Sequence, residues 1–207
     1  DIRQVSFNQS HDLDPSVLAS GQVVFSRWDG AGPRSAVHLY RMNPDGTDLE
    51  LYYGAHSHAT GTGGATIQFI QPRQMADGRV LTLVRPFVSA DWGGDLVPVD
   101  AGHFVENLQP LALNAGLLSG PPQERATIND VRTDGSISPG GEFNAAFPLE
   151  DGTSRVFVSW SPCRVVSGGS VVPCTTQSLA DPAAVAAPPL YGIWLYDLVA
   201  DTLVPVF

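Results

Sequence analysis

A glycine turn followed by an apolar, strand-like run recurs three times along the chain, and this recurrence limits the fold more than any other pattern. The turns lie at Gly21, Gly78 and Gly141, each preceded by a small or acidic residue. Glycine adopts positive φ angles without steric cost, which suits a tight turn that leads into a strand. The recurrence therefore predicts an all-β fold built from repeated antiparallel units.

Runs rich in β-branched and aromatic residues, bounded by turn residues, predict the individual strands. They cover 22–28, 36–42, 49–53, 67–71, 79–86, 143–148, 155–160 and 192–198. The 21 glycines and 17 prolines favour short strands over helices. We expect one or two helical turns at most, over 181–187, where Asp181 occupies an N-cap position and prolines follow.

The spacing of the turns exceeds the roughly 40 to 50 residues usual for a propeller repeat. We therefore expect insertions, at 54–66, 112–127 and 161–189. With these, the sequence predicts about three β-propeller blades of four-stranded antiparallel sheets, roughly at 9–60, 61–127 and 128–207. Propellers close with about 4 to 8 blades, so we expect an incomplete propeller whose remaining blades belong to a longer polypeptide or to another chain. The alternative is a two-sheet sandwich whose hairpins merely resemble repeats.

The first predicted blade resembles a known repeat. Asp12 and Pro15 ahead of a strand, the turn at Gly21, and a strand bearing Tyr40 that ends in Asn-Pro-Asp-Gly-Thr at 43–47 resemble the PD40 (WD40-like) repeat of TolB-like propellers. Within that group, 5–28 together with 54–58 is similar to the propeller region of hydrazine synthase alpha subunit-like proteins. This resemblance implies a large extracytoplasmic protein in which a propeller lies beside other domains, some of which bind haem.

The sequence departs from the haem-binding pattern of that group. It contains no Cys-x-x-Cys-His, so we expect no covalent c-type haem on these residues. No catalytic residue is carried over from the resemblance, and the sequence identifies no other cofactor. It also lacks a Gly-x-Ser-x-Gly elbow for serine hydrolysis.

Charge and cysteine content restrict the partners and the compartment. A formal net charge of −10 with only 11 basic residues provides no basic stripe, so nucleic acid is not an expected partner. No stretch approaches the roughly 20 apolar residues of a spanning helix, so no membrane insertion is expected. Cys163 and Cys174 flank two short apolar arms and form either a disulfide across a hairpin or two unlinked thiols. A disulfide would indicate a periplasmic or secreted protein.

Two histidines are the candidate metal ligands. His56 and His58 lie two residues apart in a glycine-rich loop, so in an extended segment both rings would project to the same side. Together with His11, Asp12 or Asp14 they would offer nitrogen and oxygen ligands to zinc or copper. The alternative is that they are loop histidines bonded to neighbouring backbone.

Asp12 and Asp14 form a candidate carboxylate pair. Aspartates in such turns usually accept hydrogen bonds from nearby backbone amides and cap the entry to a strand. The alternative is a role in general acid–base catalysis. Trp92 is the tryptophan expected to be exposed and able to stack on a ligand. With the Asp-Gly turns, it raises the further alternative of a carbohydrate- or calcium-dependent recognition protein.

The predicted function is a non-catalytic binding or scaffold module of a larger extracytoplasmic protein. Propellers present loops at one face of a rigid core, and here the loops are long. The partner is expected to be a protein or the remaining blades. The alternative function is the propeller region of a multi-domain haem-containing redox enzyme similar to the hydrazine synthase alpha subunit.

Overall fold

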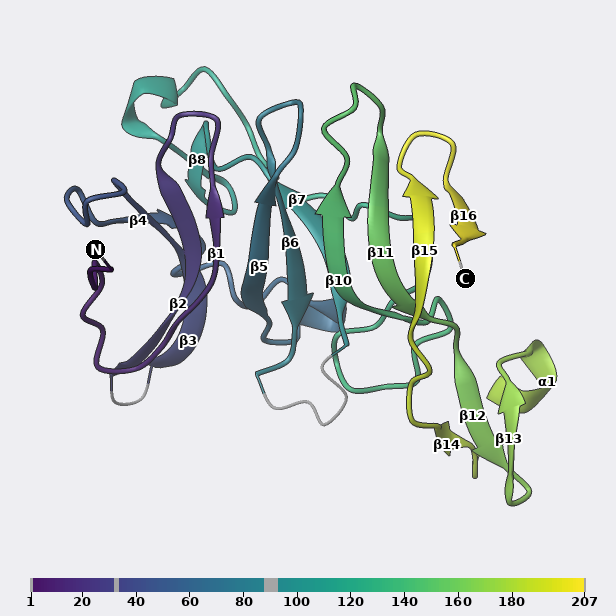
Figure 1. The fold of residues 1–207 in the computed structure, drawn as a ribbon. Coiled ribbons are helices and arrows are strands. Elements are labelled where there is room, and N and C mark those ends of the chain that lie inside the picture. Colours follow the sequence, from purple (N-terminus) through teal and green to yellow (C-terminus); the bar gives the residue numbers. More distant parts are fainter. Residues whose placement is uncertain (1, 32–33, 88–92, 207) are drawn as a thin grey trace.

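Antiparallel sheets joined by loops make up the chain (Figure 1). The computed structural model describes residues 2–31, 34–87 and 93–206. Over these ranges the sheets have up to four strands and do not close into a barrel, so the all-β class expected from the recurring turns is confirmed. No helix in the same ranges is both long enough and apolar enough to cross a membrane.

Three sheets follow one another in chain order. Sheet 1 contains β1 (Asp12–Val17), β2 (Val23–Ala31), β3 (Arg34–Met42) and β4 (Glu50–Tyr53). Sheet 2 contains β5 (Gln68–Gln74), β6 (Val80–Arg85) and β7 (Asp95–Val99). Sheet 3 contains β10 (Glu142–Pro148), β11 (Arg155–Ser161), β15 (Gly192–Asp197) and β16 (Thr202–Pro205). Each of the eight predicted strands corresponds to a strand in these sheets, so those predictions are confirmed.

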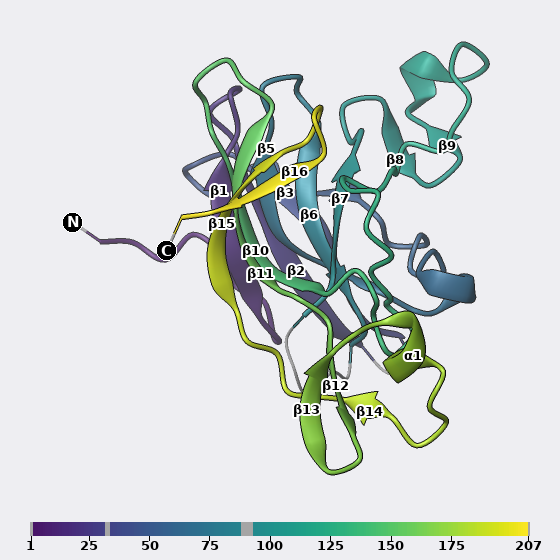
Figure 2. The same cartoon turned by 90° about the vertical axis from the view of Figure 1, so that its right-hand side faces the viewer.

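Shorter elements occupy the connections between the sheets. They are the 3₁₀ helix η1 (Thr62–Gly64), the pair β8 (Phe104–Glu106) and β9 (Gln109–Pro110), the 3₁₀ helix η2 (Ala112–Asn114), the strands β12 (Arg164–Ser167), β13 (Ser170–Pro173) and β14 (Val185–Ala186), and helix α1 (Thr176–Leu179). The β12–β13 hairpin, β14 and α1 project from one end of sheet 3 (Figure 2).

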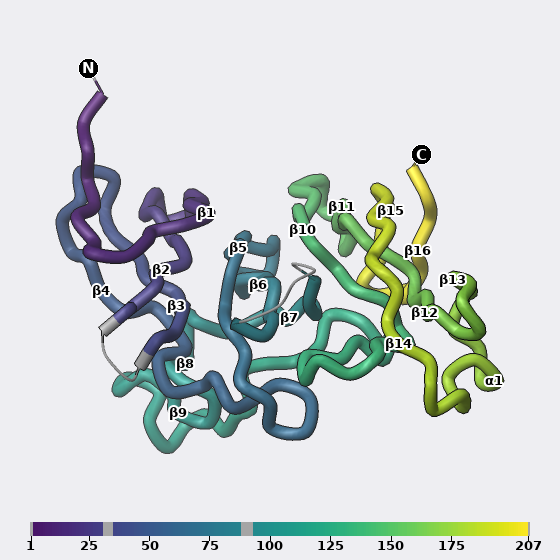
Figure 3. Tube along the Cα trace, turned by 90° about the horizontal axis from the view of Figure 1, so that it is seen from below, coloured from purple at the N-terminus to yellow at the C-terminus, as the bar shows by residue number. Residues whose placement is uncertain are grey.

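Sheet 2 is the middle layer of a stack of three, which is visible end-on in Figure 3. Every residue of β6 is buried, because consecutive side chains of a strand point to opposite faces and both faces are covered. Val80 and Val84 pack in one cluster with Leu39 of sheet 1. Leu81 and Leu83 pack in a second cluster with side chains of sheet 3. The two clusters hold the three sheets together as a continuous stack.

The first strand of each sheet contains a register shift. The register shifts within β1 between Leu13 and Ser16, and within β5 between Ile70 and Arg73. A residue with positive φ lies in each shift and precedes a proline: Asp14 at 53° and Gln71 at 54°. In β10 the register also shifts, though without a positive φ angle. Bulges bend a strand and increase its twist, and all three sheets begin with a strand interrupted in this way.

The structure corrects one part of the sequence repeat. Gly21 and Gly78 connect the first and second strands of their sheets, whereas Gly141 precedes the first strand of sheet 3. The residue that corresponds to Gly21 is Gly152, between β10 and β11, with a φ of 78°. Turn chemistry alone does not say which two strands a turn connects, which explains the error.

The expected helix over 181–187 is wrong in position. The observed helix α1 begins five residues earlier, at Thr176, where Thr175 and Ser178 form a reciprocal capping box. Asp181 instead accepts hydrogen bonds from Ala183 N and Ser167 Oγ. Residues 185–186 pair with β12, so a strand contact replaces the helical conformation that local sequence favours.

Candidate functional site

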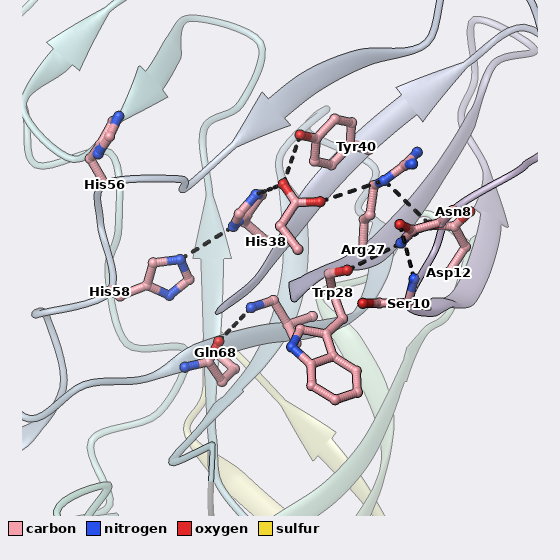
Figure 4. A network of polar contacts seen from close by, with 12 residues as sticks. Asn8, Ser10, Asp12, Arg27, Trp28, His38, Tyr40, His56, His58 and Gln68 are labelled. Carbon is pink, nitrogen blue, oxygen red and sulfur yellow. Dashed lines mark hydrogen bonds and ion pairs between the residues drawn. The ribbon is translucent and has the colours of Figure 1, made fainter. Parts of the chain in front are cut away.

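A chain of polar contacts runs across one face of sheet 1 and continues into the loop that connects β4 to β5 (Figure 4). The register of β2 and β3 builds it. Arg27 lies opposite His38, and because side chains alternate along a strand, Asp29 and Tyr40 lie on the same face. Three side chains, those of Arg27, His38 and Tyr40, thus converge on the carboxylate of Asp29.

Asp29 is the centre of this chain. Its Oδ2 atom accepts a hydrogen bond of 3.0 Å from the Tyr40 hydroxyl and lies 3.0 Å from His38 Nε2. Arg27 Nε lies 3.7 Å from the other carboxylate oxygen. Burial, followed by the bond to Asp29, raises the pKa of Tyr40, so Tyr40 stays protonated and acts as a donor.

Arg27 links this centre to the start of the sheet. Its Nε atom is also 3.7 Å from Asp12 Oδ1, and its guanidinium lies over the Tyr40 ring, 5.1 Å from the centroid. Asn8 donates to Asp12 Oδ1 at 3.2 Å and to the Trp28 carbonyl at 3.1 Å. The segment before β1 is therefore fastened to β2 by polar side chains.

The other end of the chain is a pair of histidines. His38 Nδ1 lies 3.4 Å from His58 Nε2, and His58 Nδ1 lies 2.6 Å from the carbonyl oxygen of Ile67. His38 is buried and His58 is half-buried. Burial lowers the pKa of His58, with a smaller contribution in the same direction from His38 and an opposing one from the Ile67 carbonyl. A neutral His58 is the form that this environment favours.

The two histidines expected to act together have different surroundings. The exposed ring of His56 lies away from the His38–His58 pair (Figure 4). The His56 backbone N–H donates to Glu106 Oε2 at 2.9 Å, and Ser57 Oγ donates to the same oxygen at 2.6 Å. These contacts fasten the loop to β8, and they bring His58 rather than His56 to the edge of β3.

The remaining candidates from the sequence lie as follows. His11 stacks on Trp28 with ring centroids 5.4 Å apart. Asp12 bonds to Asn8 and contacts Arg27, as described above, rather than capping a backbone amide, and Asp14 lies in the bulge of β1. Trp92 lies outside the described residues. Within the described ranges no three or more His, Cys, Asp or Glu side chains gather as metal ligands.

Cys163 and Cys174 form a disulfide with a Cα–Cα distance of 5.4 Å. The β12–β13 hairpin brings them together, since Arg164 pairs with Pro173 and Ser167 with Ser170. Of the two alternatives left by the sequence, the structure therefore has the disulfide. Such a bond is typical of proteins in oxidising compartments.

A buried acid, Asp95, lies at the junction of sheet 2 with the chain that follows β9. The Asp95 side chain is only 5% exposed, and its Oδ2 atom accepts a 2.6 Å hydrogen bond from Arg125 Nε. Burial raises its pKa to about 6 although Arg125 opposes the shift. Asp95 and Arg125 line a cavity of about 290 Å³ together with Thr60, Thr62 and Thr133. The sequence did not identify Asp95 as a candidate, because its burial depends on the folded structure and not on neighbouring residues in the chain.

Polar residues at alternate positions of β2 and β3 were the available sequence signal for the main site. Arg27 and Asp29, and likewise His38 and Tyr40, are two residues apart. This spacing places each pair on one face of its strand, but the register between the two strands was not available from the spacing.

The comparisons with known proteins identify a fold and not a family. Neither the known protein families nor the curated protein sequences include a match to the chain. Among solved structures the chain is similar to hydrazine synthase from Kuenenia stuttgartiensis, with a TM-score of 0.61 and 19% sequence identity. The match covers 99% of this chain and 20% of the hydrazine synthase chain, so it spans about a fifth of that protein's length. At this identity the similarity shows a shared fold alone.

Proposed function

We propose that this chain is a scaffold and binding region of a larger, extracytoplasmic, propeller-like protein, with blade units at 9–60, 61–127 and 128–207. Three antiparallel sheets stacked in chain order, each starting with a bulged strand, support the blade assignment. The disulfide supports the extracytoplasmic location. The polar chain on sheet 1 supports a scaffold role, because most of its groups are bonded to one another.

One observation carries the proposal: the outer face of sheet 3 is apolar and exposed. Its cross-strand register places Phe147 opposite Phe157, Phe157 opposite Leu195, and Leu195 opposite Val204. Phe147 is 59% exposed, Phe157 40% and Val204 56%. The reverse face of the same sheet packs on sheet 2. An apolar row on an exposed sheet face marks an interaction surface.

The occupant of this face is a further antiparallel sheet of the same kind. Sheet 1 packs on sheet 2 and sheet 2 packs on sheet 3 through rows of apolar side chains, and the exposed row continues that arrangement. The next sheet belongs to the same polypeptide or to a second chain. Longer loops and the negative net charge favour a basic or metal-bearing protein as the external partner.

The second candidate function is the propeller region of a haem-containing redox enzyme similar to hydrazine synthase. The structural similarity over nearly the whole chain favours it. The chain itself has no Cys-x-x-Cys-His, so under this proposal a c-type haem belongs to another part of the protein and these sheets support the domain that carries it.

The first experiment is the intact mass of the natural protein together with its absorption spectrum. A mass far above 22.0 kDa with a haem Soret band would support the redox enzyme, and a colourless protein of high mass would support the scaffold. A colourless monomer of about this mass would contradict both.

A variant tests the apolar face separately. In the natural protein, Phe157→Asp places a charge beneath the next sheet, where an unpaired buried charge costs several kcal/mol. We expect a clear loss of thermal stability or of assembly, measured by calorimetry and light scattering. Leu113→Asp is the control, since Leu113 is 92% exposed in η2. Equal effects of the two substitutions would show that nothing covers sheet 3.

A further inference from the structure

We propose that Arg73 anchors a binding site for a small organic acid, a monocarboxylate with an apolar body, in the groove between the first strands of the three sheets. Those strands, β1, β5 and β10, lie side by side where the sheets converge (Figure 3). Two cavities of about 520 and 360 Å³ lie along them, and Arg73 and Phe147 line both. The larger cavity alone has the volume of a small-molecule pocket.

The register shifts in the first strands determine which residues line this groove. The register resumes at Ser16 in β1, at Arg73 in β5 and at Ala145 in β10. All three residues line one or both of the cavities. A bulge changes the direction in which a strand presents its side chains. Of the three corresponding positions, the one in sheet 2 carries a charged group, and that group is a guanidinium.

The contacts of Arg73 leave one edge of its guanidinium free. The Nη1 atom donates to the carbonyl oxygens of Pro72 at 2.8 Å and of Asp14 at 3.4 Å. These two bonds orient the planar group, and within residues 2–31, 34–87 and 93–206 nothing bonds to its Nε or Nη2 atom. Arginines elsewhere in the chain form ion pairs with its carboxylates, namely Arg27, Arg41, Arg79, Arg125, Arg132 and Arg155.

The free edge has the geometry that binds a carboxylate. The N–H groups on Nε and Nη2 point in the same direction, and they match the two oxygens of a carboxylate or a phosphate in a pair of parallel hydrogen bonds. Arg73 is half-buried, and hydrogen bonds are stronger where the surroundings are less polar than water. An anion with two oxygens in one plane is therefore the ligand that this edge favours.

The rest of the groove selects among anions. The larger cavity has apolar side chains in its wall, namely Val17, Leu18, Met75 and Phe147. Glu150 also lines it, and Asp14 lines the second cavity. Among the described residues that line the two cavities, Arg73 is the one cation. Two carboxylates and a net charge of −10 repel a dianion such as phosphate more than a monoanion. A monocarboxylate with an apolar body therefore fits the groove best.

This inference goes beyond the function proposed above, which concerns the outer face of sheet 3 and the sheet that covers it. Stacking of sheets requires apolar faces, and it does not require an unpaired guanidinium beside a cavity. The two proposals also fail separately. Arg73 belongs to sheet 2, so the loss of acid binding leaves the packing of sheet 3 as it was.

The first test is isothermal titration calorimetry of the natural protein at pH 7. Sodium benzoate and sodium hexanoate carry the carboxylate on a flat and on a flexible apolar body. Benzyl alcohol lacks the charge, and sodium phosphate lacks the body. We expect one saturable site for at least one of the two acids, and at least tenfold weaker binding of benzyl alcohol and phosphate. No saturable binding of either acid would overturn the proposal, and this is the result if another carboxylate of the natural protein already occupies Arg73.

Variants show whether the fork of Arg73 is the anchor. Arg73→Gln and Arg73→Lys should each weaken binding of the acid at least tenfold, because lysine keeps the charge but not the two parallel donors. Arg79→Gln removes an arginine that is paired with Asp77 in the following turn, and it should leave the affinity unchanged. Equal affinity in Arg73→Gln and the wild type, or an equal loss in Arg79→Gln, would overturn the proposal.

A chemical measurement on the unmodified protein does not depend on how the variants fold. Phenylglyoxal reacts with guanidinium groups, and peptide mass spectrometry shows which arginines are modified. We expect the acid to slow the modification of Arg73 and to leave that of Arg132, which is paired with Asp130 outside the groove, unchanged. Equal protection of both arginines would overturn the proposal. So would equal protection of Arg73 by phosphate, which would identify a site for anions in general.

Discussion

The titration of Asp95 gives a quantitative test of how the three sheets pack. Its side chain is 5% exposed between sheet 2 and the segment that carries Arg125. Burial raises the pKa of Asp95 from 3.8 to about 6, and the ion pair with Arg125 offsets only part of that effect. The desolvation of the charged carboxylate therefore outweighs its attraction to the guanidinium.

The sign of the resulting pH dependence follows from linkage. Between pH 4 and 6 the folded protein binds this proton and the unfolded chain releases it, so stability from this group falls as pH rises. The contribution is complete below pH 3.8 and is lost as the pH rises through about 6. At 1.36 kcal/mol per pH unit the loss amounts to about 3 kcal/mol.

The perturbation is Asp95→Asn, which keeps the shape and an acceptor for Leu96 N but does not titrate. Urea unfolding of the wild type and the variant from pH 4 to pH 7.5 gives the difference in unfolding free energy at each pH. As the pH rises from 4 to 7.5, we expect the unfolding free energy of the variant to increase by about 3 kcal/mol relative to that of the wild type. Asp77→Asn, at a half-exposed turn of sheet 2, should show no such trend.

The opposite trend would refute the reasoning. If the ion pair with Arg125 dominated, the folded pKa would lie below 3.8, and Asp95→Asn would become relatively less stable as the pH rises. A flat difference would show that Asp95 is solvated, and hence that the segment carrying Arg125 does not cover sheet 2 in solution.

Two further perturbations, one substitution and one disulfide reduction, test contacts that only the folded chain contains. Gln68 is buried and its Oε1 atom accepts a 2.5 Å hydrogen bond from Val37 N, so Gln68→Ala should cost about 1–3 kcal/mol by leaving a buried amide unpaired. Gln74→Ala, which removes an exposed bond, should cost less in the same thermal unfolding assay. Reduction of the Cys163–Cys174 disulfide, which closes a short loop, should remove about 3 kcal/mol of local stabilisation. We expect faster proteolysis of the β12–β13 hairpin with an unchanged melting temperature of the sheets, and a large fall in that temperature would contradict the peripheral position of the hairpin.

The positions of most strands followed from the sequence because strands and turns depend on local chemistry. Apolar runs bounded by glycine and proline identified eight strands, and the spacing of Cys163 and Cys174 across two apolar arms suggested their disulfide. The same local signals failed where pairing decided the outcome. Residues 185–186 form a strand because they pair with β12. The turn at Gly141 leads into the first strand of sheet 3 because that sheet begins with β10, in the order β10, β11, β15, β16.

The candidate site shows the same division. The sequence singled out His58, but it paired that residue with His56, the neighbour in the loop. The structure pairs it with His38, 20 residues away in the chain, because Glu106 holds the loop and the edge of β3 presents the second ring. The pKa of Asp95 likewise depends on burial between segments that are distant in sequence. Local sequence thus determined which residues form strands and turns, whereas the tertiary structure decided which polar groups meet, since those contacts depend on strand register and on how the sheets stack.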